Sequence, residues 1–132
     1  MEIVCLRDGP SSVTAYCLPT STGAINNYFE LAKALGPDHS IYGIQLADRE
    51  QSGKFRLFSS IKEMASSITT ELLRRHPVGP ICLIGYSFGA SLAIESALQL
   101  TERGKSVPLV VIIDMAVPSA SLSPLFRTKH FI

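Results

Sequence analysis

A serine between two glycines is the feature of this sequence with the clearest chemical meaning. Residues 85–89 read Gly-Tyr-Ser-Phe-Gly, the pattern G-x-S-x-G, in which a sharp turn from a strand into a helix exposes a nucleophilic hydroxyl. Only neighbours without side chains fit beside so tight a turn, and Gly85 and Gly89 meet that demand. The N–H of Phe88 would then face the oxyanion formed when Ser87 attacks a carbonyl carbon. The alternative is a turn in which Ser87 is an ordinary helix N-cap.

Asp114 is the candidate for the acid that orients a catalytic base. It ends the apolar run that follows the helix after Ser87. In α/β-hydrolases the catalytic residues stand at the carboxyl ends of parallel strands, in the chain order serine, acid, histidine. Asp114 fits the second place in this order, although an aspartate that merely caps a strand or starts a turn would occupy a similar position.

No histidine of this chain is a convincing general base. His39 and His76 both precede Ser87, which is the wrong order for this fold, and each is predicted to be a solvated surface residue. His130 follows Asp114 too closely for another helix and strand to form between them. We therefore expect the residue that takes the serine proton to be missing from this chain.

Apolar runs separated by Gly, Pro and Ser predict alternating strands and helices, and hence an α/β fold with a mostly parallel sheet flanked by helices. Ser60 and Glu63 have capping-box spacing at the start of the best-signalled helix, which runs up to Pro77. The continuous apolar run 81–84 is typical of a central parallel strand covered on both faces. Further strands are expected at 13–18, 40–44 and 109–113, and further helices at 28–35 and 87–100.

Composition and charge narrow the functional classes. The 132 residues carry a net charge of +1 and contain no basic run, so neither nucleic acid nor a membrane is an expected partner. No segment approaches a membrane span and no signal peptide is evident, which favours the cytoplasm. Cys5, Cys17 and Cys82 lack metal-binding or disulfide spacing and are predicted to lie in buried strands, and no metal site is expected.

The chain resembles the thioesterase domains that end nonribosomal peptide and polyketide synthases, and the related type II thioesterases. Such a resemblance implies an α/β-hydrolase fold. It also implies that residues 1–132 are the first part of one such domain, without the lid, the last strands and the region of the catalytic histidine. The landmarks are, in order, residues 3–7 (IVCLR), 15–19 (AYCLP), 31–38 (LAKALGPD), 41–45 (IYGIQ), 61–65 (IKEMA), 85–89 (GYSFG) and 111–114 (VIID).

Residue by residue, the resemblance implies that Ser87 accepts an acyl or peptidyl group from the phosphopantetheine thioester of a carrier protein. Asp114 would be the orienting acid, and Phe88 would give one oxyanion donor. The second donor would be a backbone N–H of Thr20 or Ser21, in a loop that has one glycine where the family usually has several. No cofactor would be bound by the domain itself.

Two other readings stay open at this stage. The chain could be a catalytically inactive α/β-hydrolase-like module that docks a carrier protein or another partner. An acyltransferase is less favoured, because the related elbow usually has histidine before the serine, where this chain has Tyr86.

Overall fold

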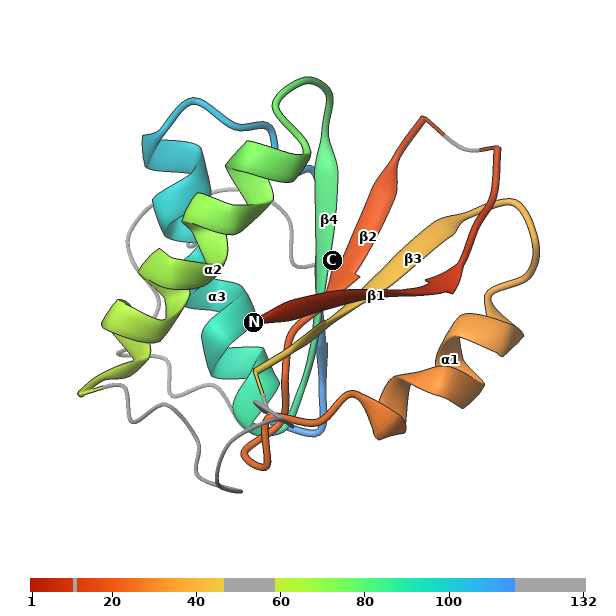
Figure 1. The fold of residues 1–132 in the computed structure, drawn as a ribbon, viewed down its shortest axis with the longest axis horizontal. Coiled ribbons are helices and arrows are strands. Elements are labelled where there is room, and N and C mark those ends of the chain that lie inside the picture. Colours follow the sequence, from red (N-terminus) through yellow and green to blue (C-terminus); the bar gives the residue numbers. More distant parts are fainter. Residues whose placement is uncertain (11, 47–58, 116–132) are drawn as a thin grey trace.

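The structure is a computed structural model that describes residues 1–10, 12–46 and 59–115. These residues form one five-stranded sheet flanked by helices (Figure 1). The strands are β1 (Glu2–Arg7), β2 (Thr14–Cys17), β3 (Ser40–Gln45), β4 (Ile81–Tyr86) and β5 (Val110–Ile113); the helices are the 3₁₀ turn η1 (Asn26–Tyr28), α1 (Phe29–Ala34), α2 (Ile61–Arg75) and α3 (Phe88–Glu102).

The strand order is β1-β3-β2-β4-β5. Strands β3, β2, β4 and β5 run parallel, whereas β1 pairs antiparallel with β3 at one edge. The predicted α/β class and mostly parallel sheet are confirmed, as are the four strands expected from apolar runs. A strand was also predicted around Cys5, without bounds, and β1 contains that residue.

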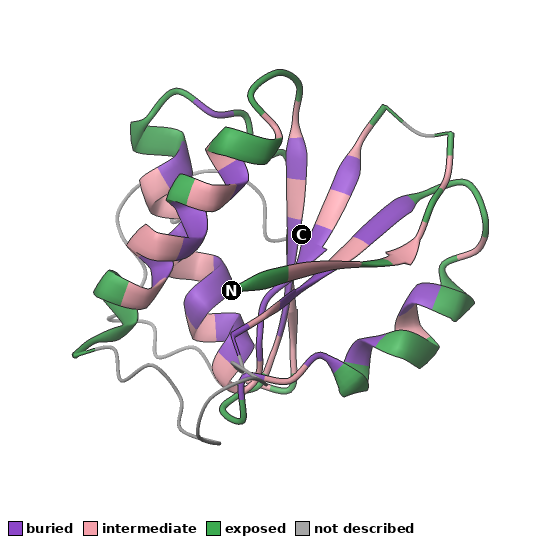
Figure 2. Cartoon of the chain, in the orientation of Figure 1, coloured by how far each residue is buried: buried purple, intermediate pink, exposed green. Residues whose placement is uncertain are grey.

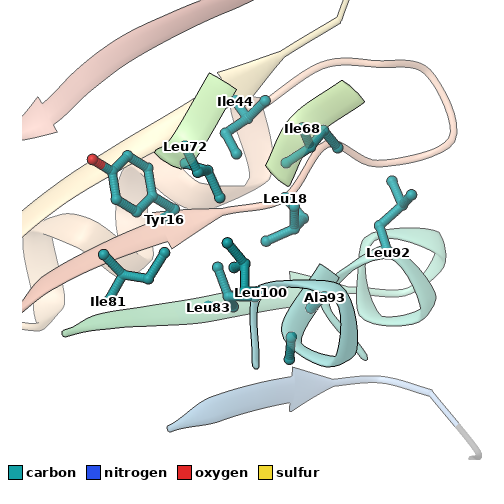
Figure 3. Close-up of a cluster of buried hydrophobic side chains, with 11 residues drawn as sticks. Tyr16, Leu18, Ile44, Ile68, Leu72, Ile81, Leu83, Leu92, Ala93 and Leu100 are labelled. Atoms are coloured by element: carbon teal, nitrogen blue, oxygen red, sulfur yellow. The ribbon is translucent and has the colours of Figure 1, made fainter. Parts of the chain in front are cut away.

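Helices cover the sheet from both sides. α2 and α3 lie together against one face, and α1 lies on the other (Figure 1). The larger hydrophobic cluster fills the space between the sheet and the α2–α3 pair, and Ile68, Leu83 and Leu92 are fully buried in it (Figure 3). A smaller cluster on the α1 side contains Cys17 and Tyr28. Buried residues lie along the strands and on the helix sides that face the sheet (Figure 2).

The chain reverses its winding direction between β2 and β4. From β2 it passes through α1 to β3 on one side, and from β4 it passes through α3 to β5 on the other. The two loops that leave the carboxyl ends of β2 and β4 therefore diverge, and a crevice at such a switch point is where open α/β sheets bind their ligands. Residues 18–24 and Ser87 flank this point.

The contacts at the start of α2 differ in one detail from the capping box predicted at Ser60 and Glu63. Ser60 is the N-cap, and its Oγ accepts a hydrogen bond from the N–H of Glu63 at 3.1 Å. The Glu63 carboxylate, however, accepts from the N–H of Ser59 at 2.8 Å and from the Ser59 hydroxyl at 2.5 Å. A polar residue directly before the cap thus offers two donors to the carboxylate.

The cysteines also differ in part from expectation. Cys17 is buried, Cys82 is half-buried and Cys5 is exposed, and all three are free thiols. Burial raises the pKa of Cys17 to about 12. The predicted burial was wrong for Cys5, because its strand, β1, lies at the edge of the sheet.

The cap of α2 allows a first prediction. Ser60→Ala should lower the free energy of unfolding by about 1 kcal/mol, because the Glu63 N–H loses its acceptor. Ser67→Ala in the middle of the same helix is the matched control and should be neutral or stabilising by about 0.5 kcal/mol, because alanine has the higher helix propensity. Denaturant unfolding of both variants checks this, and equal effects would contradict the capping role.

Candidate active site

Ser87 occupies the turn between β4 and α3 with a backbone conformation that is rare for a residue with a side chain. Its φ is 52° and its ψ is −117°. Conformations of this kind cost about 1–3 kcal/mol and are concentrated at functional sites. The side chain is exposed and makes no N-cap hydrogen bond to α3. This last observation counts against the alternative in which the serine only caps the helix.

The two glycines of the motif are required by close backbone contacts. A Cβ on Gly85 would lie 2.3 Å from the carbonyl oxygen of Gly89 and 2.5 Å from the Cα of Ala90. A Cβ on Gly89 would lie 2.9 Å from the carbonyl oxygen of Leu18. The strand, the first turn of α3 and the loop after β2 therefore touch backbone to backbone.

The first turn of α3 directs N–H groups toward the carboxyl end of β4, where Ser87 lies. Phe88 is its first residue, and no hydrogen bond among the described residues occupies its N–H. Two residues further on, the N–H of Ala90 bonds to the carbonyl of Ser87 at 3.0 Å. Since the amino end of a helix carries positive partial charge, a negative oxygen beside Ser87 would be stabilised there.

The loop after β2 is closed by internal hydrogen bonds. The Thr20 N–H donates to the carbonyl of Ala24 at 3.3 Å, and the Gly23 N–H donates to the carbonyl of Thr20 at 2.8 Å. The Ser21 N–H has no partner among the described residues, and Ser21 is exposed. Of the two predicted second donors, only Ser21 therefore has an unoccupied N–H.

Asp114 lies directly after β5, at the same edge of the sheet as Ser87. Tyr86 and Ile113 are paired across β4 and β5, and the Ser87 N–H donates to the carbonyl of Ile113 at 2.9 Å. Asp114 is exposed and has a positive φ of 55°. No hydrogen bond joins its carboxylate to Ser87 within the described residues, which leaves both side chains free for a third group.

The histidines lie elsewhere. His39 directly precedes β3, at the amino edge of the sheet, and is exposed as predicted. His76 follows α2 near the same edge but is half-buried against Tyr16, whose hydroxyl is 3.4 Å from its Nδ1. Its predicted solvation was wrong, and burial, with Lys105 nearby, lowers its pKa. His130 lies outside the described residues.

One residue near the site was not foreseen as part of it. Tyr28 was predicted only as an apolar position of a helix, but its hydroxyl donates to the carbonyl of Leu18 at 2.6 Å and accepts from the N–H of Tyr86 at 2.9 Å. No local sequence signal reveals this role, because the two partners lie at the ends of two different strands.

In residues 1–10, 12–46 and 59–115, no group of three His, Cys, Asp or Glu side chains could hold a metal ion, and no helix could cross a bilayer.

Comparisons with known proteins identify the family of this chain. A family model described as "Thioesterase domain" matches residues 14–124. The chain is 35% identical over 99 residues to malpibaldin synthetase of Mortierella alpina, covering 75% of this chain and 2% of that protein. It is similar to a crystal structure of a four-domain nonribosomal peptide synthetase (TM-score 0.73, 29% identity, 88% of this chain and 9% of that one). It is also similar to the type II thioesterase BorB from the borrelidin biosynthetic cluster (TM-score 0.71, 28% identity, covering 83% of this chain and 47% of that one).

These matches confirm the resemblance drawn from the sequence landmarks. The chain spans less than a tenth of the two synthetases and about half of BorB.

The contacts of Gly85 allow a second prediction. Gly85→Ala should lower the free energy of unfolding by about 3 kcal/mol or more, because its Cβ would strike backbone atoms that cannot rotate away. Gly104→Ala is the control: Gly104 has a φ of 79° and open space around it, so only backbone strain of about 1–2 kcal/mol is expected. Equal losses in thermal or denaturant unfolding would show that the close approach at the elbow does not exist.

Proposed function

Since this chain belongs to the thioesterase domain family, a family of hydrolases, we propose that it releases acyl or peptidyl groups from carrier-protein thioesters through Ser87. The setting would be nonribosomal peptide or polyketide biosynthesis. The observation that carries the proposal is the strained, exposed Ser87 at the carboxyl edge of β4, one strand away from Asp114.

In the proposed reaction the Ser87 Oγ attacks the carbonyl carbon of the thioester. A carbon–oxygen bond forms, and negative charge moves to the carbonyl oxygen. The N–H groups of Phe88 and Ser21 support a role as its donors, because neither has another partner among the described residues. When the oxyanion collapses, the carbon–sulfur bond breaks and the pantetheine thiol leaves with a proton.

A general base must take the Ser87 proton and return it to the leaving thiolate. Asp114 supports this step as the group that orients an imidazole, because among the described residues its carboxylate and the Ser87 hydroxyl have no partner and lie at one sheet edge. His39 and His76 do not supply the imidazole, since both lie toward the opposite edge. The base therefore belongs to residues outside those that the structure describes.

The acyl group is then held on Ser87 as an ester until a second nucleophile attacks it. Water releases a free acid, and a hydroxyl or amine within the acyl chain releases a ring. The carrier protein is the proposed partner, and its phosphopantetheine presents the substrate.

The test of the nucleophile uses the complete gene product and an acyl-pantetheine thioester. Ser87→Ala should lower kcat/KM by at least about 10³-fold, because the proposed acyl ester needs the Ser87 hydroxyl. Rapid quenching and mass spectrometry of the unmodified protein should find the acyl group on the peptide that contains Ser87. Ser67→Ala is the matched control and should leave the rate unchanged. Substantial turnover by Ser87→Ala, or an acyl group on another residue, would refute the proposal.

The role of Asp114 has its own test. Asp114→Asn should lower kcat on the order of 10³–10⁴-fold, because the amide no longer holds the imidazole in the productive tautomer. Asp38→Asn is the control, since Asp38 is an exposed aspartate before β3 at the opposite edge. Equal rates for the two variants would assign Asp114 to a structural turn.

A further inference from the structure

The hydrogen-bond ladder between β2 and β4 is interrupted at the candidate site. The last direct rung is the bond from the Leu18 N–H to the carbonyl of Ile84, at 2.8 Å. In a regular parallel ladder the next rung would run from the Tyr86 N–H to the carbonyl of Leu18. Instead, the Tyr86 N–H donates to the hydroxyl of Tyr28 at 2.9 Å, and that hydroxyl donates to Leu18 at 2.6 Å.

We infer that Tyr28 is a positioning residue that sets the spacing of the two oxyanion donors, by placing its hydroxyl between the ends of β2 and β4. This inference rests on the proposed function. A single rung would bring the two strand ends within one hydrogen bond of each other, about 2.9 Å between nitrogen and oxygen. The inserted hydroxyl replaces that rung with two bonds in series, so the strands separate at the point where the active-site crevice begins.

The Tyr28 hydroxyl bridges Leu18 and Tyr86, and each of these two residues leads to one of the oxyanion donors. On one side, Leu18 and Pro19 lead directly into the loop that carries Ser21. On the other, Tyr86 is followed by Ser87 and then by Phe88, whose N–H is the first donor. A change in the bridge would therefore change the separation of the two N–H groups.

The first turn of α3 is held against the same hydroxyl. A Cβ on Gly89 would lie 3.0 Å from the Tyr28 oxygen and 3.0 Å from the carbonyl oxygen of Pro19. The helix that presents the Phe88 N–H thus packs on the hydroxyl and on the loop at once. Movement of either would be transmitted to the helix end.

The tyrosine itself is well fixed. Tyr28 is 1% exposed and lies in the hydrophobic cluster with Cys17, Ile25 and Ile84. Burial raises its pKa to about 12, although the bond from the Tyr86 N–H lowers it. The hydroxyl therefore keeps the proton that it donates to Leu18 at neutral pH.

The fifth prediction concerns Tyr28→Phe in the complete gene product, assayed with an acyl-pantetheine thioester. We expect kcat to fall about 10- to 100-fold while KM changes less than about threefold, because the donors act on the transition state more than on the bound substrate. Tyr42→Phe is the matched control: Tyr42 is a half-buried tyrosine of β3 that stacks on Tyr16, and both of its kinetic constants should be unchanged.

A second measurement does not depend on activity or on the variant. In the unmodified protein the Tyr86 amide should exchange its hydrogen far more slowly than the unpartnered Ser21 amide, and Tyr28→Phe should accelerate it. Rapid exchange of Tyr86 in the unmodified protein would overturn the bridge, even if Tyr28→Phe did not fold. An unchanged kcat in folded Tyr28→Phe would overturn the positioning role while Ser87→Ala still abolished turnover. Full activity of Ser87→Ala would instead refute the proposed function.

Discussion

The arrangement of the candidate site depends on one constraint: three backbone segments meet with no space for a side chain between them. The end of β4, the first turn of α3 and the loop after β2 are in contact at Gly85 and Gly89. With the strand and the helix so close, the connecting residue must turn through a left-handed conformation, and that residue is Ser87. Its strain of about 1–3 kcal/mol is offset by the burial of β4 and α3 in the core. The serine is exposed because the elements around it are fixed.

The same contact explains why both oxyanion donors can be rigid. Backbone N–H groups stabilise a developing charge best when they are already oriented and need not move during the reaction. Phe88 is oriented by α3, which is anchored by fully buried Leu92 and Leu100. Ser21 is oriented by a loop whose own hydrogen bonds close it between Thr20 and Ala24. The Tyr28 hydroxyl adds a hydrogen-bonded link between Leu18, which leads into this loop, and Tyr86, which leads into α3.

Much of this fold follows from local sequence. Continuous apolar runs identified β4 and β5, and Gly-x-Ser-x-Gly identified the turn between β4 and α3, because its glycines have no function except to allow close approach. For β1 the apolar residues around Cys5 indicated a strand but not its place at the edge of the sheet beside β3, so its partial burial was not predicted. The Glu63 carboxylate accepts from Ser59, a contact that the spacing of Ser60 and Glu63 did not indicate.

The details of the candidate site were less predictable, because they arise from contacts between distant segments. The family resemblance implied Thr20 or Ser21 as the second donor, and the distinction came from a hydrogen bond that closes the loop. Tyr28 looked like one more apolar residue of a helix. Its hydroxyl gained a role only because β2 and β4, which are far apart in the chain, end side by side in the sheet. A buried tyrosine whose hydroxyl takes the place of a ladder rung is therefore a feature of topology. It lies where the winding of the sheet reverses, which is also where the strands must separate if a ligand is to enter.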